Sequence, residues 1–175
     1  MNNKEEKQII HEDIFDVNCW QINLMPSEKS ERRNKEFVWA LQDECIKRGI
    51  FGIGMTASQK GNYVYRTIKK GDYVVTKHKN GHYYIGRVSS DGAINIVKDD
   101  PIISLFSWYG TVDMWYEFTH DYDIPDKIVD WFSQRFHPTI RRIVPQMLKL
   151  MVISMYERKS GDKICNISDL GRLKK

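Results

Sequence analysis

Asp72-Tyr73-Val74-Val75-Thr76-Lys77-His78 and His82-Tyr83-Tyr84-Ile85-Gly86-Arg87-Val88, joined by Lys79-Asn80-Gly81, are the two runs of sequence that decide the fold. Both runs are rich in β-branched and aromatic residues, which favour β-strands. The Asn-Gly pair between them predicts a type I′ turn, because both central residues of that turn need a positive φ. The sequence therefore predicts an antiparallel β-hairpin at the centre of the fold.

Further strand patterns lie on both sides of this hairpin. In residues 19–24, Trp20, Ile22 and Leu24 occupy alternate positions, which predicts a strand with these three side chains on one face. Residues 50–54 form a short apolar segment with two glycines, which favours a buried strand that passes close to other backbone. Later apolar runs predict strands at residues 93–97, 102–106, 111–118 and 139–143.

Helical patterns separate and follow the strands. Residues 34–48 predict an amphipathic helix, because Phe37, Val38, Leu41 and Cys45 recur at helical spacing and Gly49 follows as a C-cap. Trp39 lies on the far side of that stripe, either as a second packing contact or as an exposed binding residue. Prolines open two more predicted helices, at residues 126–132 and 145–159.

The predicted strands outnumber the helical crossovers between them. This order favours an α/β (α+β) chain with a curved mixed β-sheet or partial barrel flanked by helices, and argues against a doubly wound parallel sheet. We expect three parts: a polar N-terminal tail at residues 1–15, a single domain at residues 16–144, and a C-terminal helix with a basic tail at residues 145–175.

Composition narrows the class of protein. The chain has 175 residues, of which 41% are hydrophobic and 29% charged, as in a globular domain. No apolar stretch reaches the roughly 18 residues of a membrane span, and the N-terminus lacks the apolar region of a signal peptide, so we expect a cytoplasmic protein with no membrane partner.

Motifs for catalysis and for metal binding are missing from the sequence. The three cysteines, Cys19, Cys45 and Cys165, are far apart and predict neither a disulfide framework nor a zinc site. His78 and His82 belong to opposite arms of the predicted hairpin and are not expected to bind a metal. No P-loop, nucleophile elbow or Rossmann glycine set occurs, so we expect a binding protein without cofactor and not an enzyme.

Charge is distributed unevenly along a chain whose formal net charge is +4. Residues 60–88 contain seven lysines and arginines and one acidic residue, whereas residues 99–130 contain eight acidic residues and one lysine. This asymmetry predicts one basic face and one acidic face. A basic face favours an anionic partner such as nucleic acid.

A series of short motifs occurs in a fixed order along residues 17–144. They are Trp20-Gln21-Ile22-Asn23, Gly49-Ile50-Phe51-Gly52-Ile53-Gly54, Lys70-Gly71-Asp72-Tyr73-Val74-Val75, Tyr84-Ile85-Gly86-Arg87-Val88, Val112-Asp113-Met114-Trp115, Asp123-Ile124-Pro125 and Thr139-Ile140-Arg141-Arg142-Ile143. This order resembles the PUA-like superfamily, in particular EVE-type and YTH-type modules and the related readers fused to bacterial restriction nucleases. The resemblance implies a curved, barrel-like sheet that binds nucleic acid, often with a modified base in an aromatic pocket.

The resemblance and the sequence together give two sets of candidate site residues. The expected base pocket consists of Trp20, Met55, Thr56, Ser58, Trp108 and Tyr109. In many such readers a tryptophan follows the glycine-rich strand; this chain has Met55 there, whose sulfur can pack on a ring. Stacking on an aromatic side chain contributes roughly 1–3 kcal/mol per base. The expected phosphate contacts are Lys69, Lys70, Lys77, Lys79 and Arg87.

Two kinds of function remain open on the sequence alone. The first is a reader module that binds DNA or RNA, with a base, modified or methylated, flipped into the aromatic pocket. The second is a small interaction or inhibitor protein, for example an anti-defence protein or nuclease regulator, that uses the same fold as a scaffold. Its surface would be the apolar helix 145–159, which otherwise fills a groove on its own domain, together with the acidic stretch 113–130.

Overall fold

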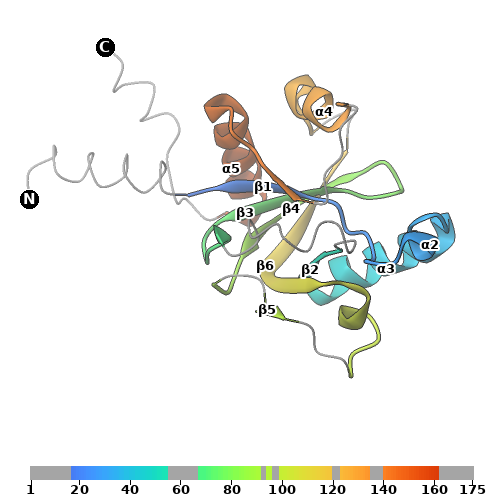
Figure 1. Ribbon diagram of the computed structural model, residues 1–175. Coiled ribbons are helices and arrows are strands. Elements are labelled where there is room, and N and C mark those ends of the chain that lie inside the picture. Colours follow the sequence, from blue (N-terminus) through green and yellow to red (C-terminus); the bar gives the residue numbers. More distant parts are fainter. Residues whose placement is uncertain are drawn as a thin grey trace, which may run out of the picture.

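The structure of this chain is a computed structural model, and it describes residues 17–54, 67–91, 94–95, 99–119, 123–134 and 140–161. The predicted tail 1–15 lies outside these residues, and so do residues 162–175 of the predicted C-terminal part 145–175. The elements, shown in Figure 1, are β1 (Cys19–Ile22), α2 (Lys29–Arg32), α3 (Lys35–Arg48), β2 (Ile50–Ile53), β3 (Tyr73–Lys77), β4 (Tyr83–Val88), β5 (Ile94–Asn95), η3 (Ile103–Leu105), β6 (Trp108–Phe118), α4 (Asp126–Phe132), β7 (Ile140–Arg142) and α5 (Gln146–Ser160).

The strands form one curled, mixed sheet, which confirms the predicted fold class. Their order is β2-β6-β4-β3-β1-β7, and β5 pairs with β6 outside this path. β1 and β3 are parallel, and the other pairs are antiparallel. The register shifts between Gly86 and Val88 on β4, opposite residues 112–115 of β6, so β6 bends and pairs with β4 at one end and β2 at the other. β1 and β2 also approach each other without a shared ladder, which makes the sheet a partial barrel.

The inner face of the sheet encloses one hydrophobic cluster. Trp20, Ile22 and Leu24 all point into it, as their alternation predicts, and α3 adds Leu41 and Cys45. The remaining members of this inner cluster are Ile50, Phe51, Ile53, Ile68, Val74, Val88, Ile103, Phe106, Val112, Trp115 and Ile140. The cluster fills the partial barrel and closes it on the side of α3.

The outer face of the sheet carries a second cluster beneath α4 and α5, which lie together on the opposite side of the sheet from α2 and α3 (Figure 1). Most of the apolar side chains of α5 pack here, among them Leu148, Val152, Ile153, Met155 and Tyr156. Helix 145–159 therefore fills a groove on its own domain with most of its apolar surface, although Met147 stays 56% exposed.

Two glycines of the inner cluster lie under aromatic rings. A Cβ atom on Gly52 would lie 2.2 Å from the ring of Phe106, and one on Gly110 would lie 2.2 Å from the ring of Phe51. Gly54 is equally restricted, since a Cβ there would lie 2.1 Å from the carbonyl oxygen of Met25. The close approach of backbone predicted for residues 50–54 is thus confirmed.

The hairpin forms where the sequence predicts it, but its turn is of another type. Gly81 has a φ of 89°, whereas no non-glycine residue in the described chain has a positive φ, so Asn80 does not fit a type I′ turn. The amide of Gly81 donates to the carbonyl of His78, and the amide of His78 donates to the carbonyl of His82. This pattern is a three-residue loop with glycine in the left-handed position, the next most common hairpin connection.

The ends of the predicted helices are confirmed, whereas two predicted strand boundaries are wrong. Residues 102–106 form no strand; they contain the short 3-10 helix η3, and the strand that follows starts three residues earlier than predicted. Trp108 and Tyr109 consequently lie inside β6 and not in a connection. The predicted helices agree with α3, α4 and α5 to within a residue or two, including the left-handed C-cap at Gly49. In the described part of the chain, no helix has the length and apolarity needed to cross a membrane.

Asp72 joins β1 to the turn that precedes β3. Its carboxylate is 2% exposed and accepts hydrogen bonds from the backbone amides of Asn18 and Lys69 and from Nε1 of Trp20, each at 3.0 Å. Bonds to a carboxylate are about twice as strong as neutral ones, so three of them offset the burial of the charge. Asp72 thereby fixes both the Trp20 indole and the backbone of the Lys69–Gly71 turn.

We predict that Asp72→Asn destabilises the fold by about 1–3 kcal/mol, because the new amide N–H group must face one of the three donors. Urea unfolding measures this directly. The matched control is Asp113→Asn, which changes an exposed carboxylate on β6. Equal unfolding free energies for the two variants would show that Asp72 does not hold these elements together.

Candidate nucleic-acid interface

Trp20 is part of the interior of the protein. Its side chain is 1% exposed, belongs to the inner cluster and donates its Nε1 hydrogen to Asp72. In this arrangement the indole presents almost no surface to a ligand. Its place in the predicted base pocket stays a prediction, and its visible role is to anchor β1.

Trp108 and Tyr109 occupy the first two positions of β6 and are half-buried against the same inner cluster. They pair with Ile53 and Gly52 of β2. Met55, Thr56 and Ser58 lie outside the described residues, which stop at Gly54 directly after β2. The structure brings Trp108 and Tyr109 beside β2, the strand that precedes Met55 in the sequence.

Arg32 marks the place where the ends of β1 and β2 meet. Its guanidinium donates from Nε to the carbonyl of Pro26 at 2.6 Å and from a terminal nitrogen to the carbonyl of Gly54 at 2.8 Å. Burial lowers the pKa of this half-buried side chain, and it forms no ion pair with any described residue. No sequence pattern predicts this role of Arg32, because in a charged connection no spacing distinguishes an arginine that binds backbone carbonyls.

Three of the five predicted phosphate contacts lie at one end of the β3–β4 hairpin. Lys69 and Lys70 are exposed in the turn before β3, and Gly71 follows with a φ of 91°. The guanidinium of Arg87 on β4 lies next to this turn, 3.7 Å from where a Cβ of Gly71 would be. Two carboxylates accept from the backbone of this turn, Asp72 from the amide of Lys69 and Asp91 from the amide of Lys70.

Arg87 and its cross-strand neighbour Tyr73 have unpaired polar atoms. Nε of Arg87 and the hydroxyl of Tyr73 are both buried and have no hydrogen-bond partner among the residues that the structure describes. Burial raises the pKa of Tyr73, and the positive charge of Arg87 opposes this shift. A donor without an acceptor costs about 1–3 kcal/mol when buried, so this pair lacks stabilising hydrogen bonds that the described residues do not supply.

The other two predicted contacts, Lys77 and Lys79, lie at the opposite end of the hairpin. Nζ of Lys77 lies 5.4 Å from the centre of the Tyr83 ring, and the amide of Lys79 donates to Oε1 of Gln42 on α3. The structure therefore divides the basic residues of the hairpin into two groups, separated by the length of β3. A single phosphate cannot contact both groups.

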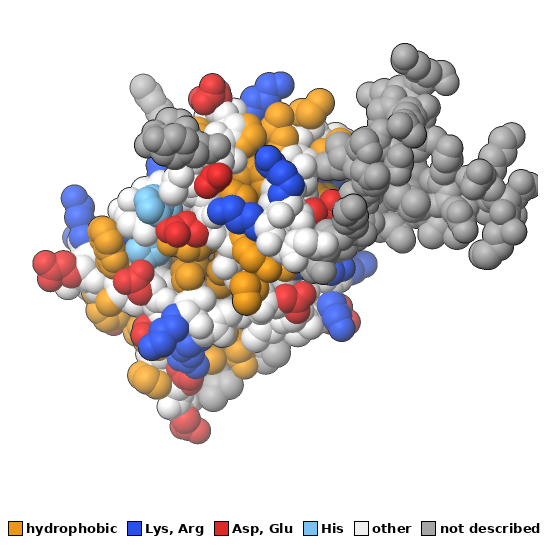
Figure 2. All heavy atoms as spheres, turned by 180° about the vertical axis from the view of Figure 1, so that it is seen from behind, with side chains coloured by type: hydrophobic (Ala, Val, Ile, Leu, Met, Phe, Trp, Pro, Cys, Tyr) orange, Lys and Arg blue, Asp and Glu red, His pale blue; other side chains and the backbone are white. Residues whose placement is uncertain are grey.

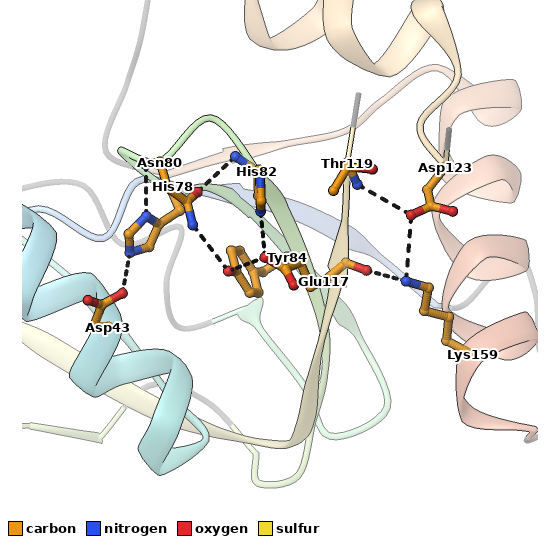
Figure 3. A network of polar contacts seen from close by, with 9 residues as sticks. All are labelled: Asp43, His78, Asn80, His82, Tyr84, Glu117, Thr119, Asp123 and Lys159. Atoms are coloured by element: carbon orange, nitrogen blue, oxygen red, sulfur yellow. Dashed lines mark hydrogen bonds and ion pairs between the residues drawn. The ribbon is translucent and has the colours of Figure 1, made fainter. Parts of the chain in front are cut away.

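A polar network runs across the hairpin tip from α3 to α5 (Figure 3). Nε2 of His78 lies 2.8 Å from Oδ1 of Asp43, at an ion-pair distance but without hydrogen-bond geometry, and Nδ1 of His78 accepts from the amide of Asn80. On the other arm, Oε1 of Glu117 lies 2.8 Å from the Tyr84 hydroxyl and 2.5 Å from Nδ1 of His82.

The same network ends at Lys159 of α5. Nζ of Lys159 donates to the carbonyl of Glu117 and lies 3.7 Å from Oδ2 of Asp123. The two histidines thus each have a carboxylate neighbour of their own, on opposite arms of the hairpin as predicted. The network ties the hairpin tip to both helical layers, so the tip has one fixed shape.

Positive and negative side chains are mixed on the surface. Figure 2 shows one face of the molecule, on which lysines and arginines alternate with acidic side chains and apolar side chains lie between them. Within the acidic stretch, Glu117 and Asp123 are engaged with His82 and Lys159. Basic residues therefore form local groups on this face and not a continuous stripe.

Acid should weaken the His82–Glu117 contact. The hydrogen bond from His82, with a smaller contribution from Tyr84, lowers the pKa of Glu117 from its ordinary value of 4.5. Because the pKa of Glu117 is lower in the folded state than in the unfolded state, its charged carboxylate stabilises the fold at any pH above the ordinary pKa. This stabilisation is lost as the pH falls through the pKa of the folded state. Glu117→Gln should therefore lose less stability than the wild type between about pH 6 and about pH 3.

Thermal unfolding across this pH range checks the effect, with Glu36→Gln on α3 as the control. A wild type and a Glu117→Gln variant with parallel pH profiles would contradict it.

Comparison with known proteins gives one distant likeness. No protein-family model and no curated protein matches the chain. Among solved structures, the N-terminal domain of Thermococcus gammatolerans McrB bound to m5C DNA matches with 12% sequence identity and a TM-score of 0.42, over 78% of this chain and 96% of that one.

Proposed function

We propose that this chain binds nucleic acid as a reader module of the PUA-like type. In this proposal Lys69, Lys70 and Arg87 contact the phosphate backbone, and a base lies beside Trp108 and Tyr109. The observation that carries it is the guanidinium of Arg87, which lies beside the Lys69–Gly71 turn and whose Nε has no hydrogen-bond partner among the described residues.

The chemistry of Arg87 favours a phosphate. A guanidinium presents several donors in a fixed fork that matches the oxygens of a phosphate. The Arg87 side chain is half-buried, and its Nε has no hydrogen-bond partner among the described residues. Lys69 and Lys70, both exposed, add charge that attracts a polyanion without fixing its sequence.

The aromatic residues support a base site next to β2. Trp108 and Tyr109 are half-buried and lie at the start of β6, opposite the end of β2. Arg32 holds the same end of β2 through the carbonyl of Gly54. A base flipped out of a duplex regains stacking on such rings, and a methyl group on the base adds apolar area to bury. Binding measurements with DNA and RNA, each with and without methylated bases, decide the kind of ligand and its modification.

The interaction-protein alternative has less support. Its predicted surface, helix 145–159, buries most of its apolar side chains in the outer cluster. Its acidic stretch is partly neutralised, because Glu117 and Asp123 contact His82 and Lys159.

We predict that Arg87→Gln weakens binding of an oligonucleotide by about tenfold or more, because a charge-assisted hydrogen bond is lost. It should also lower the slope of log K against log salt concentration by about 0.9, the value for one duplex phosphate contact. Fluorescence anisotropy with labelled single-stranded and double-stranded DNA and RNA, each with and without methylated bases, measures both quantities.

Lys127→Gln is the matched control, since it removes one exposed positive charge from α4. If the two variants weaken binding equally, Arg87 is not a phosphate contact. If the wild-type protein binds none of these oligonucleotides at low salt, the proposed function is wrong.

A further inference from the structure

Trp39 has an unusual position for a tryptophan of this chain. It lies on α3 and its side chain is 46% exposed, whereas Trp20 and Trp115 are 1% and 7% exposed. Large exposed rings are uncommon on a monomeric surface and often mark a binding site. Trp39 is not part of the inner cluster, which α3 contacts through Leu41 and Cys45.

The ring of Trp39 is held in a fixed orientation. It lies edge to face with the His78 ring, with centroids 5.4 Å apart and planes at 89°. His78 is 2% exposed and is itself fixed by Asn80 and Asp43, as Figure 3 shows, and its ring lies 5.9 Å from that of Tyr84. An aromatic side chain that is already oriented loses little conformational entropy when a ligand stacks on it.

Charged groups of both signs surround Trp39. Lys35 lies one helical turn before Trp39 on the same side of α3, and Lys79 is the neighbour of His78 in the hairpin loop. Both lysines are exposed and form no ion pair with described residues. Two carboxylates also lie on this side of α3, Glu36 three residues before Trp39 and Asp43 four residues after it, and Asp43 contacts His78.

We propose that Trp39 is a stacking platform for an unpaired base of the bound nucleic acid, with Lys35 and Lys79 contacting the adjoining phosphates. This inference rests on the proposed function, and it adds a second contact at the hairpin tip, away from the Arg87 end. A ring face beside free cations is the combination used for single-stranded nucleic acid. It also gives Lys79, which the Arg87 site cannot use, a place in the interface.

The experiment compares two substitutions of the same residue. Trp39→Leu keeps an apolar side chain but removes the ring, and Trp39→Phe keeps a smaller ring. Affinity for a single-stranded oligonucleotide should fall about 5- to 100-fold in Trp39→Leu and much less in Trp39→Phe. A perfect duplex of the same sequence should show a smaller loss, because its bases are already stacked.

Two controls separate stacking from other effects. Met114→Ala removes an exposed apolar side chain from β6, 55% exposed, and should leave affinity unchanged. Thermal unfolding verifies that each variant is folded, and quenching of tryptophan fluorescence by the oligonucleotide should be smaller in Trp39→Phe than in the wild type.

The outcomes distinguish this inference from the proposed function. If the wild type binds, Arg87→Gln weakens binding and Trp39→Leu does not, the platform is wrong and the proposed function stands. If Trp39→Leu and Trp39→Phe lose affinity equally with unchanged quenching, or if Trp39→Leu alters only the sedimentation behaviour of the protein, Trp39 serves another contact. If no oligonucleotide binds to the wild type, both are wrong.

Discussion

The hydrogen bonds of one buried carboxylate organise the centre of this protein. Asp72 accepts from Asn18, Trp20 and Lys69 and so connects β1, the inner cluster and the turn before β3. Because the turn is held from inside, its lysine side chains face outward and its backbone passes beside the Arg87 guanidinium. The charge of Asp72 is satisfied by neutral donors, which leaves the neighbouring cations free for an external anion. The same interaction thus stabilises the fold and fixes the turn that carries the proposed phosphate contacts.

The curled sheet explains why the candidate contacts lie at its ends. Its two faces are covered, by the inner cluster with α3 and by the outer cluster with α4 and α5, so a ligand reaches only turns, strand ends and helix surfaces. Trp108 and Tyr109 lie at the start of β6, Arg87 lies beside the turn before β3, and Trp39 faces the hairpin tip. A chain of nucleotides, unlike a small molecule, is long enough to contact several such places.

Periodicity predicted the parts of this fold that depend on burial. The alternation of Trp20, Ile22 and Leu24 and the helical stripe on α3 follow from which side chains enter the core, and the structure confirms them. The turn type was wrong because side chains decide it: the amide of Asn80 donates to Nδ1 of His78, and the amide of His82 donates to Oδ1 of Asn80, which favours the three-residue loop. Arg32 and the Asp72 donors escaped prediction, because contacts to backbone groups far away in sequence leave no local pattern. The exposure of Trp39 was left open, since helical spacing places a side chain on a face but does not tell what covers that face.

The central claim is that anions contact the ends of the sheet where cations lack protein partners. Nuclear magnetic resonance of the ¹⁵N-labelled protein, titrated with a short oligonucleotide at low salt, tests it most directly by mapping the contact surface. The account predicts shifts at the Arg87 Nε–H, at the amides of Lys69–Gly71 and at the Trp39 indole N–H, and none along the exposed side of α4. Shifts confined to α4 and the acidic stretch, or no shifts at saturating oligonucleotide, would contradict it.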